Sequence, residues 1–313
     1  MRTPLPIETA LPALLDALRT AGQAVLEAPP GAGKTTRVPL AILEEWLGAG
    51  RIVMLEPRRI AARAAAERMA ETLGEKVGQS VGYRIRGEAK VSKATQIEVV
   101  TEGILTRMLQ SDPSLDGVGT VIFDEFHERS LNADLGLALC LEVREALRDD
   151  LQLVVMSATL DGAAVADLLG GAPVVRSPGR AFDVDVRWLE RPVRNGQRFE
   201  AAVADLVRLA VAESDGGVLV FLPGEGEIRR VAGMLDLPPG CAVRPLYGAM
   251  PFADQRAAIA PVATGRKVVL ATAIAETSLT IEDVRVVVDG GRARRARFDP
   301  GSGMARLVTE PVS

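Results

Sequence analysis

Short apolar runs alternate along the chain with stretches in which apolar residues recur at helical spacing. Continuous apolar runs are typical of strands buried on both faces of a parallel sheet, and the helical stretches between them supply the crossover connections. In the first half this pattern predicts strands over residues 23–28, 51–55, 96–100, 120–123 and 151–156, and helices over 60–73, 103–109 and 134–147.

The alternation pauses at two glycine- and proline-rich segments, 170–173 and 177–180, and then resumes. The second half predicts strands over 218–222, 242–246, 267–271 and 284–288, helices over 200–212, 225–235 and 252–261, and a hairpin with a Pro-Gly turn within 294–308. The sequence therefore predicts an α/β fold with two mostly parallel sheets, each covered by helices on both faces. We place the first domain over residues 1–179 and the second over 180–313.

Composition narrows the function classes. The chain has 313 residues, and its net charge of −4 argues against nucleic-acid binding over the whole surface. Arginine-rich segments at 51–68 and 285–306 still allow a local basic track. Cys140 and Cys241 lack metal-ligand spacing and favour a reducing cytoplasm, and no run is long enough for a membrane helix.

A glycine-rich loop follows the first apolar run and precedes an amphipathic helix. Backbone N–H groups of such a loop, together with the positive end of the helix, can bind a triphosphate. Lys34 would reach the β- and γ-phosphates, and the Thr35 hydroxyl would contact Mg²⁺. The usual motif begins with glycine where this chain has Ala28, and the alternative is a turn beside a surface lysine. The expected nucleotide-binding residues are Pro30, Gly31, Ala32, Gly33, Lys34, Thr35 and Thr36.

A second motif, Asp124-Glu125-Phe126-His127, ends another apolar run. Asp124 is placed to hold Mg²⁺, and Glu125 to orient or deprotonate an attacking water. We expect Thr35, Asp124 and Glu125 to form the metal site, and Lys34, Asp124, Glu125 and His127 to form the catalytic set. The alternative is an ordinary acidic strand end.

In this order, the segments resemble those of DEAH-box helicases of superfamily 2, and in particular the bacterial HrpB type. The matching segments are residues 31–36, 55–62, 101–105, 124–131, 157–159, 218–224, 246–248 and 271–281. The resemblance implies two RecA-like domains, ATP or another nucleoside triphosphate with Mg²⁺, and single-stranded RNA or DNA as partner. It also implies that the second domain is incomplete, because motif VI, which supplies arginines to the γ-phosphate, has no match here.

The resemblance further assigns roles to single residues. Ser157, Thr159 and Ser278 would couple the nucleotide to the nucleic acid, while Arg68 and Ile259 would flank the base. Motif V usually has asparagine where this chain has Ala273. The residues expected to contact the nucleic acid are Arg58, Arg59, Thr101, Glu102, Gly103, Thr272 and Thr277.

The resulting hypothesis is a cytoplasmic, monomeric, ATP-dependent RNA helicase whose chain, taken alone, binds nucleotide but hydrolyses it slowly. Phosphate contacts do not distinguish the sugar, so a DNA helicase or translocase stays open. Two further alternatives are a nucleotide-dependent binding module without catalysis and an unrelated P-loop ATPase. The last offers no explanation for Arg58-Arg59 or for the segment 272–281.

Overall fold

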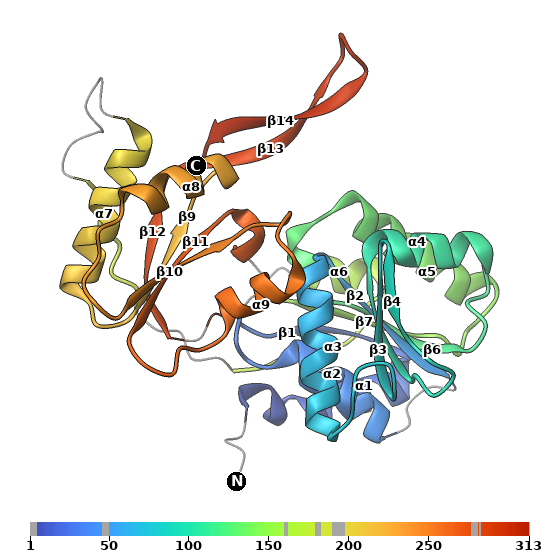
Figure 1. The fold of residues 1–313 in the computed structure, drawn as a ribbon. Coiled ribbons are helices and arrows are strands. Elements are labelled where there is room, and N and C mark those ends of the chain that lie inside the picture. The colour runs from blue at the N-terminus through green and yellow to red at the C-terminus, as the bar shows by residue number, and fades with distance from the viewer. Residues whose placement is uncertain are drawn as a thin grey trace. The chain divides into compact units, whose positions relative to one another are not determined.

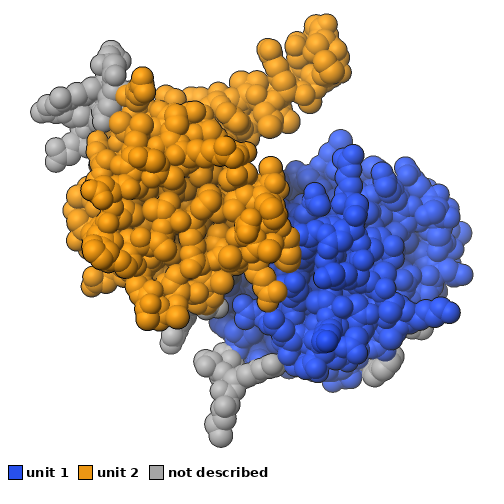
Figure 2. Space-filling model, in the orientation of Figure 1, with its two compact units in different colours: residues 1–183 blue, residues 184–313 orange. Residues whose placement is uncertain are grey.

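The computed structural model describes residues 5–45, 50–159, 162–178, 183–189, 198–276, 281 and 283–312. It divides into two compact units, Met1–Asp183 and Val184–Ser313, which Figures 1 and 2 show as a ribbon and as a space-filling view. Residues 179–182, where the sequence places the domain boundary, lie outside the described residues.

The first unit is built on an eight-stranded sheet with the order β4-β3-β5-β2-β6-β7-β1-β8. Neighbouring strands are parallel except for the antiparallel pair β3 and β4 at one edge. The strands are β1 (Gln23–Glu27), β2 (Arg51–Glu56), β3 (Val81–Ile85), β4 (Glu88–Lys90), β5 (Ile97–Thr101), β6 (Val118–Phe123), β7 (Gln152–Ser157) and β8 (Val174–Arg176).

Helices cover both faces of this sheet because successive strand residues point to opposite sides. Leu26 packs in one apolar cluster with residues of α1, α2 and α3, whereas its neighbour Val25 packs in another with residues of α4, α5 and α6. The elements are η1 (Pro6–Thr9), α1 (Leu11–Ala21), α2 (Lys34–Glu44), α3 (Arg59–Leu73), α4 (Glu102–Ser111), η2 (Phe126–Glu128), α5 (Leu131–Ala146) and α6 (Gly162–Leu168).

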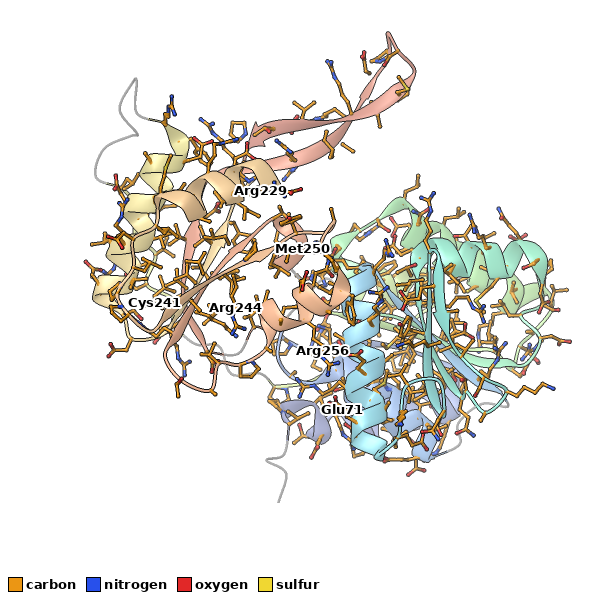
Figure 3. The ribbon with its side chains drawn as sticks, viewed as in Figure 1. Glu71, Arg229, Cys241, Arg244, Met250 and Arg256 are labelled. Carbon is orange, nitrogen blue, oxygen red and sulfur yellow. The ribbon has the colours of Figure 1, made fainter. Side chains whose placement is uncertain are left out.

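The second unit has a parallel four-stranded sheet with the order β10-β11-β9-β12. Arg244, labelled in Figure 3, donates from β10 to the carbonyls of Ala257 and Ala260, which fixes the end of α9 against the sheet. The elements are α7 (Phe199–Glu213), β9 (Gly217–Phe221), α8 (Glu225–Met234), β10 (Cys241–Leu246), α9 (Phe252–Ile259), β11 (Arg266–Ala271), η3 (Ala273–Ala275) and β12 (Val284–Asp289).

A two-stranded antiparallel hairpin of β13 (Arg292–Asp299) and β14 (Met304–Pro311) completes the second unit (Figure 1). The register places Ala296, Phe298, Ala305 and Leu307 on one face, and Arg295, Arg297 and Arg306 on the other. Phe298 and Leu307 are both exposed. The predicted hairpin is confirmed and extends beyond both predicted ends.

All nine predicted sheet strands and the six helices predicted with residue ranges are confirmed, and their ends lie within three residues of the predicted ones. The sequence analysis missed β3, β4 and β8. These strands lie at or next to the edges of the sheet, where polar residues such as Arg84 and Glu88 interrupt the apolar pattern. Among the described residues, no helix combines the length and the apolar character needed to cross a membrane.

Two leucines of the first unit provide a matched test of this core. Leu153 on β7 is 0% exposed and Leu131 at the start of α5 is 83% exposed. Leu153→Ala is expected to lower the free energy of unfolding by about 2–5 kcal/mol, because it removes buried methyl groups and leaves a cavity. Leu131→Ala is expected to stay within about 0.5 kcal/mol of the unmodified protein. Chemical denaturation followed by circular dichroism measures both, and equal effects would contradict the fold.

Candidate nucleotide site

The glycine-rich loop lies between the end of β1 at Glu27 and the start of α2 at Lys34. Gly31 has a φ of 76° and Gly33 a φ of 93°, in the left-handed region that favours glycine. Ala28 is not among the residues with positive φ, and its N–H donates to the Ser157 carbonyl at 3.0 Å. The first position of the motif therefore has no conformational need for glycine in this chain.

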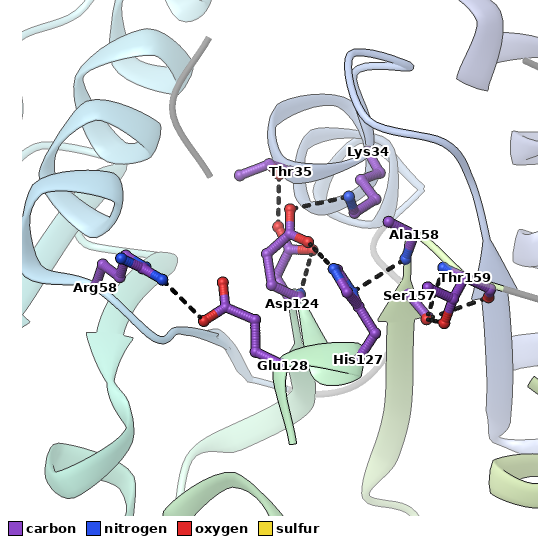
Figure 4. A network of polar contacts seen from close by, with 10 residues as sticks. Lys34, Thr35, Arg58, Asp124, His127, Glu128, Ser157, Ala158 and Thr159 are labelled. Atoms are coloured by element: carbon purple, nitrogen blue, oxygen red, sulfur yellow. Dashed lines mark hydrogen bonds and ion pairs between the residues drawn. The ribbon is translucent and has the colours of Figure 1, made fainter. Parts of the chain in front are cut away.

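The loop and the acidic motif, distant in the sequence, are in direct contact (Figure 4). Lys34 is 4% exposed, and its Nζ lies 3.0 Å from Oε1 of Glu125. The Thr35 hydroxyl donates to Oδ2 of Asp124 at 2.5 Å, and the Glu125 N–H donates to Oδ1 of Asp124 at 2.8 Å. The carboxylate of Asp124 is therefore held from both sides.

His127 connects this cluster to the end of β7. Its Nδ1 accepts a hydrogen bond from the Ala158 N–H at 3.2 Å, and its Nε2 lies 3.4 Å from Oε2 of Glu125 (Figure 4). An acceptor at Nδ1 places the ring proton on Nε2, where it faces the carboxylate. The Oγ atoms of Ser157 and Thr159 lie 3.2 Å apart beside this contact. A shift of Glu125 can thus reach the Ser157–Thr159 segment through one side chain.

The backbone of the acidic motif is strained. Glu125 has a φ of 50°, which non-glycine residues rarely adopt. Such a conformation persists only where surrounding contacts hold it, and it is common at functional sites. Here the contacts of Glu125 with Lys34 and Asp124 hold it.

The pKa values of two carboxyl groups of the site are raised. Burial, followed by the charge of Asp124, raises the pKa of Glu125, while Lys34 opposes the shift. Burial also raises the pKa of Glu56 well above its ordinary value, and the charge of Asp124 acts in the same direction. Sequence reasoning missed Glu56 as a site residue, although it ends an apolar run whose neighbours in the sheet carry the motifs.

Several expected nucleic-acid contacts lie at the same edge of the first unit's sheet. Glu56 and Thr101 are register partners and are the last residues of β2 and β5. Arg58, two residues after Glu56, and Thr101 therefore lie at the ends of adjacent strands. Arg58 Nη2 lies 3.5 Å from Oε2 of Glu128, and Oε1 of Glu102 accepts from the Ser130 hydroxyl at 2.6 Å. Arg59 and Gly103 lie in the first turns of α3 and α4.

The remaining expected site residues are distributed over both units. Thr272 follows β11, and Thr277 and Ser278 lie outside the described residues. Arg68 lies on α3 of the first unit, whereas Ile259 ends α9 of the second. That these two side chains flank a base stays a prediction.

The donor set at Thr35 and Asp124 suits Mg²⁺. Mg²⁺ prefers oxygen ligands and is bound in phosphate sites by one or two protein groups, with waters and substrate phosphates completing the shell. A hydroxyl and a carboxylate in contact provide those groups. Among the described residues, no group of three or more histidine, cysteine, aspartate or glutamate side chains is arranged to hold a metal ion.

Comparisons with known proteins place this fold and site in a class, the helicases. The model for DEAD/DEAH box helicases matches residues 8–168, and the model for the helicase conserved C-terminal domain matches residues 201–299. The first match spans more than half of the chain. The chain therefore belongs to the DEAD/DEAH box helicase family.

Individual relatives agree with this assignment. The chain is 54% identical over 312 residues to the ATP-dependent RNA helicase HrpB of Escherichia coli (strain K12), covering 99% of this chain and 38% of the relative. It is 36% identical over 323 residues to the pre-mRNA-splicing factor ATP-dependent RNA helicase prp22 of Schizosaccharomyces pombe, covering 100% of this chain and 27% of the relative. A crystal structure of Escherichia coli DEAH/RHA helicase HrpB matches with a TM-score of 0.92 at 54% identity, covering 99% of this chain and 40% of that chain.

The structural match confirms the predicted fold class of two RecA-like α/β domains, and the family matches confirm the resemblance inferred from the motifs. The chain spans about two fifths of the length of the HrpB proteins that it matches.

The buried carboxyl of Glu56 gives a pH-dependent prediction. Because its pKa in the folded protein is raised above the ordinary 4.5, folding takes up a proton. The stabilisation from that proton is complete below pH 4.5 and is lost as the pH rises through the folded-state pKa. Glu56→Gln cannot titrate, so we expect it to be more stable than the unmodified protein at pH 8, by about 1–3 kcal/mol.

Thermal unfolding without nucleotide or divalent cation, measured from pH 8 down to pH 4.5, tests this prediction. The advantage of the variant is expected to shrink as the pH falls. A variant that is less stable at pH 8, or an advantage that does not change with pH, would contradict the assignment of a destabilising buried charge.

Proposed function

We propose that this chain is the nucleotide-hydrolysing part of an ATP-dependent helicase that acts on RNA. The observation that carries the proposal is the contact of Lys34 and Thr35 with Glu125 and Asp124, because it joins a phosphate-binding loop to an acidic pair of the kind that NTP hydrolysis needs. The names of the relatives, which are ATP-dependent RNA helicases, support both the nucleotide and the RNA.

In this proposal the residues of the site act in sequence. The γ-phosphate competes for Lys34, which then leaves Glu125. Glu125, freed from its cation, holds the attacking water and takes up its proton, a role that suits a carboxyl group with a raised pKa. Thr35 and Asp124 would hold Mg²⁺, and the ion would supply positive charge that offsets the charge developing on the phosphates. His127 transmits the movement of Glu125 to Ala158.

Nucleic-acid binding would use the edge of the sheet where β2 and β5 end. Arg58 and Arg59 supply positive charge there, and backbone phosphates are the groups that such residues bind without regard to sequence. Contacts to 2′-hydroxyls would favour RNA over DNA. We further propose that the protein works as a monomer in the cytoplasm.

Two variants separate nucleotide binding from hydrolysis. Lys34→Ala is expected to weaken ATP binding by about 10- to 100-fold, the equivalent of one charge-assisted hydrogen bond. Glu125→Gln is expected to retain ATP binding and to lose about 10²–10⁴ in turnover, the usual contribution of a general base. Titration with a fluorescent ATP analogue measures binding, and steady-state phosphate release with and without single-stranded RNA measures turnover.

Lys93→Ala, which removes an exposed lysine of the same unit, is the matched control and should change neither value.

The chain alone is expected to turn over slowly, because its sequence offers no match to the arginine-rich motif VI. Nucleotide binding that survives Lys34→Ala would contradict the proposed site. Binding without any turnover, even with RNA, would favour the alternative of a nucleotide-dependent binding module.

The choice between RNA and DNA is tested by competition. A labelled single-stranded RNA is bound to the protein in the presence of a non-hydrolysable ATP analogue. Unlabelled RNA or DNA of the same sequence then displaces it from the protein. We expect RNA to compete more strongly, because DNA lacks the 2′-hydroxyls. Stronger competition by DNA would replace the RNA assignment with that of a DNA helicase or translocase.

A further inference from the structure

We propose that Glu56 is a positioning residue for Mg²⁺: its buried Oε2 would accept a hydrogen bond from a water of the bound ion. This inference rests on the proposed nucleotide site. It adds a third carboxylate to that site, beside Asp124 and Glu125, from a strand that contributes neither the phosphate loop nor the acidic motif.

The position of Glu56 follows from the sheet. β2 and β6 are parallel neighbours, and Leu55 is paired to Phe123. Glu56, the last residue of β2, therefore lies beside Asp124, the first residue after β6. The Asp124 N–H donates to the Leu55 carbonyl at 3.0 Å and fixes this alignment. The charges of Asp124 and Lys34 both act on the carboxyl group of Glu56.

Glu56 differs from the other buried glutamates of the same sheet. Glu27, 3% exposed, accepts from the Gly162 N–H at 2.9 Å and from Arg176 Nε at 2.6 Å. Glu98, 1% exposed, accepts from Arg84 Nε at 2.7 Å and from Arg51 Nη1 at 3.1 Å. Both oxygens of each carboxylate are therefore satisfied by donors, as buried carboxylates require.

Glu56 is equally buried, at 1% exposure, but its Oε2 has no hydrogen-bond partner among the described residues. Its close neighbour along the chain, Arg58, contacts Glu128. A buried acceptor beside another carboxylate, without a donor of its own, calls for a donor that arrives with a ligand.

A hydrated divalent cation is the ligand that fits both features. Mg²⁺ dehydrates reluctantly and keeps several waters when it binds through one or two protein oxygens and phosphates. The waters bound to Mg²⁺ are strong hydrogen-bond donors, and the positive charge of the ion offsets the negative charge of the adjacent carboxylates. Groups that hydrogen-bond metal ligands in this way typically contribute 10- to 100-fold to metal affinity.

The test separates metal binding from nucleotide binding. A fluorescent, non-hydrolysable ATP analogue is titrated first with excess EDTA and then at fixed concentration against Mg²⁺. Glu56→Gln is expected to raise the Mg²⁺ concentration at half-saturation by about 10- to 100-fold. Affinity for the analogue in EDTA should be unchanged or slightly higher, because a negative charge near the phosphates is removed. A residue with only a structural role would lower both affinities together.

Glu98→Gln is the matched control, since it neutralises another buried glutamate of the neighbouring strand β5 and should leave the Mg²⁺ midpoint unchanged. Glu56→Asp keeps the charge but withdraws the oxygen by one methylene, and should also raise the midpoint. If Glu56→Gln does not fold, the Mg²⁺ midpoint of Glu56→Asp tests the proposal instead. An unchanged midpoint in either folded Glu56 variant, or an equal shift in Glu98→Gln, overturns the proposal. Failure of the unmodified chain to bind the analogue at all would instead overturn the proposed function.

Discussion

Negative charge gathered at the carboxyl ends of two neighbouring strands is the constraint on which the site depends. Glu56 ends β2, and Asp124 and Glu125 follow β6, while Lys34 is the cation that contacts the group. Carboxylates in a buried setting repel one another and lose their hydration, so the arrangement opposes folding. It survives because the parallel register of the sheet holds both strand ends in place. A cationic ligand that binds here relieves the repulsion between the carboxylates, and this relief contributes to its binding free energy.

The strand order explains why one edge of the sheet can collect these groups. β1, β7, β6 and β2 are consecutive neighbours, so the phosphate loop, the Ser157–Thr159 segment and the acidic motif follow adjacent strands. Ligands of open α/β sheets bind at this edge for the same reason. His127 then bridges β6 and β7 with a single ring. A movement of Glu125 therefore has a short route to Ala158 through His127, with no need for a change in the sheet.

The sequence predicts the central strands because they are apolar on both faces, and it predicts Lys34 and Asp124 because their motifs are local. β4, at one edge of the sheet, and β3, next to it, escape prediction because polar residues such as Arg84 and Glu88 interrupt their apolar pattern. Glu56 escapes for a different reason. Its contact with Asp124 depends on β2 lying beside β6, and spatial order among parallel strands is not written in either segment. The coupling of His127 to Ala158 likewise depends on tertiary packing.

The second unit also buries a charged side chain, but there the charged group has hydrogen-bond partners, unlike Oε2 of Glu56. Lys267 on β11 is 0% exposed, and its Nζ donates to the carbonyls of Ile259 and Ala260 at 2.9 and 3.0 Å. Those carbonyls end α9, where the helix dipole favours a cation. The fold thus satisfies a buried lysine, as it satisfies Glu27 and Glu98, with local donors or acceptors. Glu56 differs from these three groups in its unpartnered Oε2, and a ligand-dependent role accounts for that difference.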